Sequence, residues 1–127
     1  MRHRRTRTPL ARDRGLASAS SGAGHWWRQR VTALALAPLT VWFVISFTEL
    51  LGADHRAYAE WIGSPINAIL MIALVAILFY HMALGLQVIG EDYLHAERTK
   101  LLTIVSIQFG CFLLAIAGVV SILRMLT

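Results

Sequence analysis

The sequence contains a single cysteine, Cys111, among its 127 residues, and this scarcity excludes several kinds of site. One cysteine cannot form an intrachain disulfide, a paired-cysteine metal site or an iron–sulfur cluster held by this chain alone. Because Cys111 stands inside an apolar run, we predict that it is a small packing residue. Any iron–sulfur chemistry that involves this chain would therefore belong to a partner.

Acidic residues are also few, and the charged residues are unevenly placed. The chain has 7 Asp and Glu against 12 Lys and Arg, which gives a formal net charge of +5. Eight of the basic residues are arginines near the start of the chain, at positions 2, 4, 5, 7, 12, 14, 28 and 30. The positive charge is thus concentrated in a tail and does not form a folded basic surface, so we expect no nucleic-acid partner.

Apolar residues dominate the rest of the chain. They make up 57% of the sequence, while charged residues make up 15%, which does not fit a soluble globule of this size. A helix needs about 20 residues to cross a hydrocarbon core of about 30 Å. Three runs meet this length, at about residues 31–51, 65–90 and 101–123. We predict an all-α integral membrane protein, a bundle of three transmembrane helices.

The third apolar run carries small and polar residues that predict contacts between helices. Gly110 and Gly118 lie eight residues apart on one helical face, which favours close packing. Gln108 is its one strongly polar side chain, and we interpret it as an interhelical hydrogen-bonding residue. Three helices with small side chains on their packing faces hardly enclose a large site alone, so we expect helices of a partner subunit to complete the bundle.

The chain divides into a basic, flexible N-terminal tail, residues 1–24, and a transmembrane anchor domain, residues 25–127. The tail also has the Arg-rich and Ser-rich composition of a mitochondrial transit peptide. Ten basic residues lie in the tail, the start of the first run and the 91–100 loop, whereas only Arg56 and Arg124 lie on the other side. The positive-inside rule then places the N-terminus in the bacterial cytoplasm, or in the matrix for a mitochondrial protein.

The second apolar run contains one imidazole, His81, which is costly to bury in a membrane. Three roles are open: a proton relay, a hydrogen-bonded packing residue, or a ligand to haem iron. At about 100° per residue, Gly85 and Asp92 fall about 40° and 20° from His81 on the same stripe, and a side-chain gap at Gly85 favours haem. The other histidines, at positions 3, 25, 55 and 95, lie outside this depth, so a second axial ligand would come from another chain.

A second cluster lies at the cytoplasmic edge, where Asp92 and Tyr93 end one run and Arg28 and Arg30 begin another. We expect these four residues at similar depth. The phenol could donate a hydrogen bond to a carbonyl of a lipid-soluble substrate, and the carboxylate could orient an arginine or relay protons. The alternative is that these side chains only anchor the helix ends at the membrane surface.

Residues 81–93, HMALGLQVIGEDY, agree with the pattern H-x-x-x-G-x-x-Q-V-x-x-D-Y at His81, Gly85, Asp92 and Tyr93, whereas Gln87 and Val88 stand one position earlier than the pattern has them. This pattern resembles the signature of the small hydrophobic membrane-anchor subunit of succinate dehydrogenase, respiratory complex II. The preceding segment 21–33, SGAGHWWRQRVTA, resembles the lead-in to the first helix of that subunit, especially in its α-proteobacterial form. With three spans in matching order, the resemblance covers roughly residues 8–124.

The resemblance implies a role for each candidate residue. His81 would be an axial ligand of haem b, with the other ligand supplied by the large cytochrome b anchor subunit. Tyr93 and Asp92 would border the ubiquinone site, Tyr93 holding a quinone carbonyl. Arg30 would lie within reach of a haem propionate or the quinone pocket.

The resemblance also implies partners and a location. An iron–sulfur subunit and a flavoprotein subunit would sit on the cytoplasmic face of the inner membrane and deliver electrons from succinate to ubiquinone, within the tricarboxylic acid cycle. Two rivals remain open. One is the anchor of a fumarate reductase, and the other is a small transporter or scaffold without haem.

Overall fold

The computed structural model describes the backbone of residues 9–127 and the side chains of residues 22–127. Every element in this part is helical, which confirms the predicted all-α fold. The four helices are α1 (Pro9–Glu49), α2 (His55–Gly63), α3 (Pro65–Tyr93) and α4 (Glu97–Met125).

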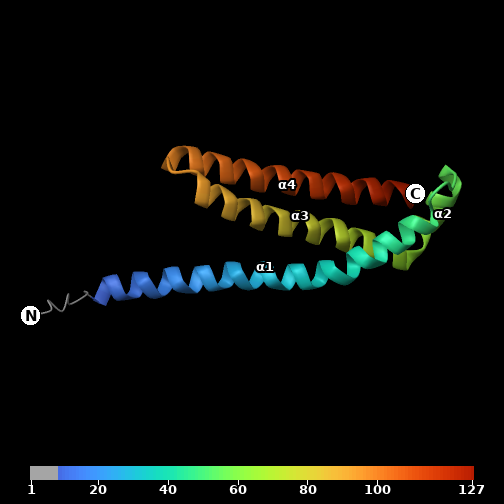
Figure 1. The fold of residues 1–127 in the computed structure, drawn as a ribbon. Helices are drawn as coiled ribbons and strands as arrows, with labels where there is room; N and C mark the ends of the chain where they lie inside the picture. Colours follow the sequence, from blue (N-terminus) through green and yellow to red (C-terminus); the bar gives the residue numbers. More distant parts are fainter. Residues whose placement is uncertain (1–8) are drawn as a thin grey trace, which may run out of the picture.

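The three long helices lie side by side, with α3 between α1 and α4 (Figure 1). In the described part of the chain, the backbone of α3 lies close to both neighbours, whereas the backbones of α1 and α4 do not lie close to each other. The start of α1 and the α3–α4 turn lie at one end, and α2 and the C-terminus lie at the other (Figure 1). Residues of α1 and α3 that face each other therefore run in antiparallel register.

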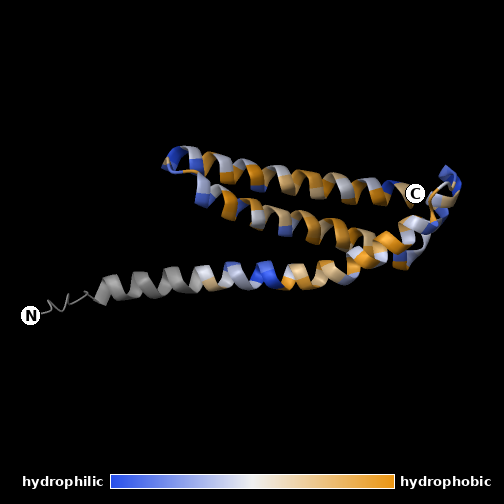
Figure 2. Cartoon of the chain, viewed as in Figure 1, coloured by the Kyte–Doolittle hydropathy of each residue, from blue (hydrophilic) through white to orange (hydrophobic). Residues whose placement is uncertain are grey.

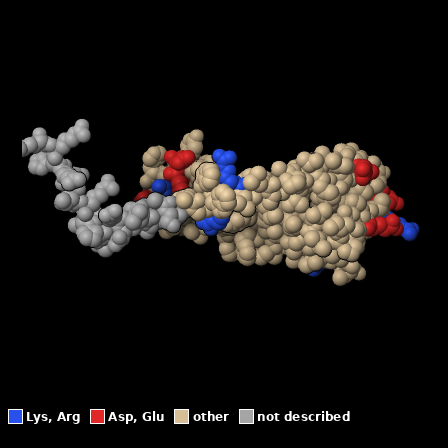
Figure 3. Space-filling view, turned by 90° about the horizontal axis from the view of Figure 1, so that it is seen from below, with Lys and Arg blue, Asp and Glu red and all other residues tan. Residues whose placement is uncertain are grey.

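All three long helices are apolar enough to cross a membrane. The most apolar stretches of 18 residues within segments 22–49, 65–93 and 97–125 have mean hydropathies of 1.9, 2.4 and 2.2. Hydrophobic colour dominates the long helices, hydrophilic colour gathers at the α3–α4 turn, at α2 and in one stretch along α1, and the middle of the face shown in Figure 3 is largely free of charge (Figures 2 and 3). Within each of these apolar stretches, at most 11% of the residues are buried inside the chain. The exposed apolar surface suits contact with lipid or with partner helices rather than water.

The helix boundaries differ from those expected from hydropathy. Residues 9–24, predicted as part of a flexible tail, are the first turns of α1, and residues 1–8 lie outside the described part. Pro9 suits a first helical turn, where its missing N–H is not needed. Helices α3 and α4 likewise extend past their apolar runs, to Tyr93 and from Glu97. An apolar run predicts the segment that crosses the bilayer, but the helix can continue through polar turns beyond that segment.

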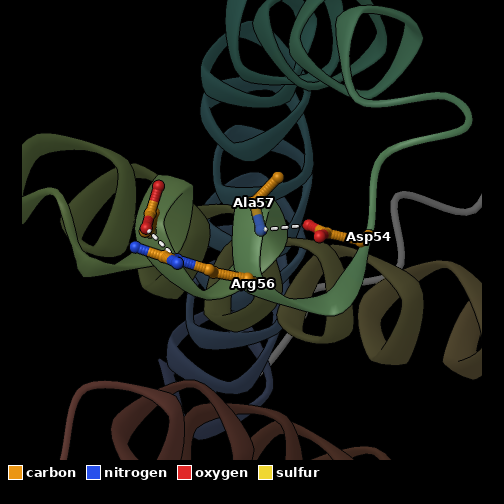
Figure 4. Close-up of polar contacts among 4 residues, drawn as sticks. Asp54, Arg56 and Ala57 are labelled. Atoms are coloured by element: carbon orange, nitrogen blue, oxygen red, sulfur yellow. Dashed lines mark hydrogen bonds and ion pairs between the residues drawn. The ribbon is translucent and has the colours of Figure 1, made fainter.

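The predicted polar hairpin between the first two spans contains a short helix, α2. Gly52 turns the chain with a φ of +82°, a conformation that few other residues adopt readily. The Asp54 carboxylate then caps α2 by accepting a hydrogen bond of 2.9 Å from the Ala57 N–H (Figure 4). Arg56 and Glu60 form an exposed ion pair at 2.8 Å one turn apart (Figure 4), which adds little stability.

Close packing occurs at one of the two glycines singled out in α4. A Cβ atom on Gly118 would lie 2.7 Å from Cγ1 of Val75, so α3 and α4 approach too closely there for a larger residue. Gly110 has no such neighbour among the described residues. The prediction is confirmed at Gly118, whereas Gly110 has no packing neighbour within residues 22–127 and its prediction stays open for a partner helix.

The two other expectations for α4 are confirmed. Cys111 is buried and unbridged, as a packing residue should be. The Gln108 side-chain amide donates a hydrogen bond of 3.0 Å to Oε1 of Gln87 on α3. Gln108 is therefore an interhelical hydrogen-bonding residue.

Candidate functional site

His81 lies half-buried on α3 and contacts the start of the first span. Its Nδ1 atom is 2.8 Å from Oγ1 of Thr32 on α1. Among residues 22–127, this is the one side-chain hydrogen bond that joins α1 to α3. The ring therefore has one nitrogen held by a neighbouring helix, while Nε2 makes no hydrogen bond within the same part of the chain.

Thr32 is itself anchored to its own helix. Its Oγ1 atom lies 2.7 Å from the carbonyl oxygen of Arg28 and 3.1 Å from that of Gln29. A hydroxyl that bonds to the preceding turn is common for threonine in a helix. Here the same oxygen makes a third contact, to His81, on another helix.

Gly85 lies one turn beyond His81 and faces the same helix. A Cβ atom there would lie 3.6 Å from Nε2 of Gln29, so the Gln29 amide covers the glycine. The amide oxygen of Gln29 is buried and has no hydrogen-bond partner among residues 22–127. The surface at Gly85 becomes free for a flat ligand only when this flexible side chain turns away.

A polar hollow of about 350 Å³ lies between α1 and α3, nearer the end that carries the α3–α4 turn. Its lining residues are Gly22, His25, Arg28, Gln87 and Glu91. The Gln87 amide donates a hydrogen bond of 2.9 Å to the Glu91 carboxylate. Nε2 of His25 is buried without a partner among residues 22–127. Arg28 and Glu91 thus line the same hollow without forming an ion pair.

These contacts fix the register between the two helices. Thr32 lies opposite His81, and Gln29 lies opposite Gly85, so facing residue numbers sum to about 113. Arg30 is then level with about residue 83 and lies roughly ten residues, or about 15 Å, deeper along the axis than Tyr93. Arg30 therefore does not share the depth of Tyr93, whereas the Arg28 side chain reaches the hollow that Glu91 also lines.

The three residues predicted to form the quinone site are not brought together in the described part of the chain. Tyr93 ends α3 with 77% of its surface exposed, and Asp92 is exposed beside it. Arg30 points to its own helix, where its guanidinium lies 5.2 Å from the centre of the Trp26 ring. Any site that includes all three must therefore be completed by other chains.

Thr32 and Gln29 are contacts of the candidate site that the sequence pattern does not predict. Both lie one turn or less beyond Arg28, in the segment that introduces the first span. A hydroxyl and an amide at the start of an apolar run could have been matched to His81 and Gly85 once the register was known. The apolar runs alone do not contain that register.

Comparison with known proteins places the chain among membrane subunits of respiratory enzymes. The family described as succinate dehydrogenase/fumarate reductase transmembrane subunit matches residues 4–115. No solved structure matches the chain.

Three relatives are each called succinate dehydrogenase hydrophobic membrane anchor subunit. The Rickettsia conorii protein is 32% identical over 106 residues, 83% of this chain and 84% of the relative. The Paracoccus denitrificans protein is 30% identical over 118 residues, 93% and 91% of the two chains. The Rickettsia typhi protein is 28% identical over 113 residues, 89% and 90% of the two chains. As the pattern at residues 81–93 predicted, the chain belongs to the family of transmembrane subunits of succinate dehydrogenase and fumarate reductase.

Proposed function

We propose that this chain is the small membrane anchor of a succinate dehydrogenase and that His81 ligates haem b. The observation that carries the haem assignment is the His81 ring itself, inside a spanning helix and held at Nδ1 by Thr32. A metal-ligating histidine commonly has one ring nitrogen held by a hydrogen bond while the other binds the metal. The donor set therefore fits haem iron, and the bound haem would supply a one-electron centre close to the substrate.

A second iron ligand would come from another chain in this proposal. Among residues 22–127, no three His, Cys, Asp or Glu side chains gather as a metal site. By the α1–α3 register, His25 is level with about residue 88, some seven residues or about 10 Å from the level of His81. The exposed apolar faces of α1, α3 and α4 offer the surface on which a large cytochrome b anchor subunit, and membrane lipid, would pack.

Tyr93 and Asp92 would form this chain's part of the ubiquinone site. A tyrosine at a helix end places its ring in the interfacial region and leaves its hydroxyl free to donate to a quinone carbonyl. Asp92 would hold or pass a proton beside it. Arg30 lies near the level of His81, so its depth supports a haem propionate, one of its two implied roles, more than contact with the Tyr93 phenol.

Electrons would reach the quinone through other subunits. With one buried cysteine, the chain holds no cluster of its own, so an iron–sulfur subunit and a flavoprotein subunit would carry succinate oxidation to the membrane. This arrangement would place the complex on the cytoplasmic face of the bacterial inner membrane, or on the matrix face in a mitochondrion, and link the tricarboxylic acid cycle to respiration. The fumarate reductase anchor is the alternative, because the family includes both enzymes.

The experiment that tests this function is purification of the native complex through an affinity tag on this chain. We expect a large anchor subunit, an iron–sulfur subunit and a flavoprotein to copurify and to reduce ubiquinone with succinate. A complex that reduces fumarate with quinol faster than it oxidises succinate would favour the fumarate reductase alternative. A chain purified without any dehydrogenase would support the transporter or scaffold alternative instead.

Cysteine labelling tests the proposed orientation. In a Cys111→Ala background, we expect His95→Cys, in the α3–α4 turn, to react from the cytoplasmic side and Tyr58→Cys, in α2, to react from the opposite side. The reason is the excess of basic residues at the end that carries the α3–α4 turn. Reaction of His95→Cys from outside would turn Tyr93 away from a cytoplasmic iron–sulfur partner and contradict the quinone assignment.

A further inference from the structure

We propose that Thr32 is a positioning residue for the haem ligand, because its hydroxyl fixes the tautomer of His81 so that Nε2 is the nitrogen offered to iron. This inference deepens the haem ligation proposed above and rests on it. It follows from the position of a single proton, which the distances around Thr32 Oγ1 determine.

The Thr32 hydroxyl has only one hydrogen to donate. Its oxygen lies 2.7 Å from the carbonyl oxygen of Arg28 and 3.1 Å from that of Gln29. Carbonyl oxygens only accept hydrogen bonds. Two oxygens at 2.7 Å repel unless a hydrogen lies between them, so the hydroxyl proton is directed to the α1 backbone and principally to Arg28.

The hydroxyl can then meet His81 only as an acceptor. Nδ1 of His81 lies 2.8 Å from the Thr32 oxygen, and this contact requires a proton that the ring must supply. Nδ1 is therefore the protonated nitrogen. In a neutral imidazole, the other nitrogen, Nε2, then carries the free lone pair that a metal ion binds.

The anchor is rigid, which makes this a positioning role as well as a choice of tautomer. Both carbonyls belong to the continuous helix α1, and the β-branched side chain of Thr32 has few rotamers in a helix. The bond crosses the half-buried α1–α3 interface, where a hydrogen bond is stronger than in water. An N–H···O bond at Nδ1 also makes the imidazole a more basic ligand.

The test compares Thr32→Val, which keeps the shape and removes the hydroxyl, with Thr32→Ser, which keeps the hydroxyl. In the assembled complex, we expect Thr32→Val to lose haem about tenfold faster or more, the range typical for partners of metal-bound histidines. Its haem midpoint potential should rise, because a less basic imidazole stabilises ferric iron less. Thr32→Ser should retain the wild-type potential and haem retention.

Two outcomes separate this inference from the proposed function. Wild-type haem retention and potential in Thr32→Val, with loss of the low-spin signal in His81→Ala, would overturn the role of Thr32 and leave haem ligation standing. A wild-type complex without haem would overturn both. If Thr32→Val does not assemble, Thr32→Ala removes the hydroxyl without adding bulk and carries the same expectation. Low-spin haem can then be followed by electron paramagnetic resonance in membranes.

Discussion

Removal of the Tyr93 hydroxyl in Tyr93→Phe should lower the ubiquinone-reductase turnover of the assembled complex about tenfold or more. The change deletes one hydrogen bond worth about 0.5 to 1.5 kcal/mol, or more if a buried quinone carbonyl loses its only donor. A loss of about 1.4 kcal/mol from transition-state stabilisation slows a reaction tenfold. Succinate oxidation by an artificial acceptor that takes electrons ahead of the quinone should stay near the wild-type rate.

Tyr58→Phe is the matched control for that variant. Tyr58 lies in α2 at the opposite end of the molecule, where its hydroxyl donates a hydrogen bond of 2.9 Å to the carbonyl oxygen of Leu50. Tyr58→Phe should leave the ratio of the ubiquinone-reductase rate to the artificial-acceptor rate at its wild-type value. If Tyr93→Phe also reduced ubiquinone at the wild-type rate, with normal haem content, its exposed ring would be an interfacial anchor only. The quinone site would then have to be sought in the partner subunits.

Replacement of His81 with alanine should abolish the low-spin signal of a haem with two histidine ligands. Alanine offers no ligand, and in the proposal the chain holds no second imidazole near that depth. The complex should then contain either no haem or a high-spin haem held from the partner side alone. Absorption and electron paramagnetic resonance spectra of the purified variant measure this directly.

His95→Ala controls for the loss of a histidine as such. His95 is exposed in the turn between α3 and α4, so its removal should leave the haem spectrum unchanged. An unaltered low-spin spectrum in His81→Ala would end the ligand assignment. In that case the bond to Thr32 would be a packing contact between α1 and α3, the role left open for a membrane histidine.

Most of the fold could be predicted from the sequence because membrane helices are recognised by the length and the hydropathy of their apolar runs. Three runs long enough to cross a bilayer have no alternative to helices when backbone groups cannot bond to lipid. The burial of Cys111 and the interhelical bond of Gln108 followed from single residues in an apolar setting. The helices are longer than the apolar runs, because their end turns are polar and hydropathy does not predict polar helical turns.

The register between helices could not be predicted in the same way. Because arginine is usually found at the membrane edge, hydropathy predicts that Arg28 and Arg30 lie level with Tyr93. The contact of Thr32 with His81 instead places α1 several residues deeper, and Arg28 lines a polar hollow with Glu91. A polar hollow of that kind lets an arginine lie deeper than the membrane edge.

The role of Thr32 was invisible for a related reason. A threonine in a helix normally satisfies its hydroxyl with the preceding turn, and Thr32 does so through Arg28 and Gln29. Only the approach of α3 shows that the same oxygen also meets His81. Side-chain contacts between helices depend on their rotation and register, which the hydropathy pattern does not specify.

The most direct test of the account is the absorption spectrum of the wild-type complex, purified through this chain, before and after addition of succinate. We predict a low-spin, b-type haem band that appears on reduction by succinate, since His81 would hold a haem in contact with the electron path from the dehydrogenase. A purified complex with no bound chromophore, or with no succinate-dependent change in its haem spectrum, would contradict it.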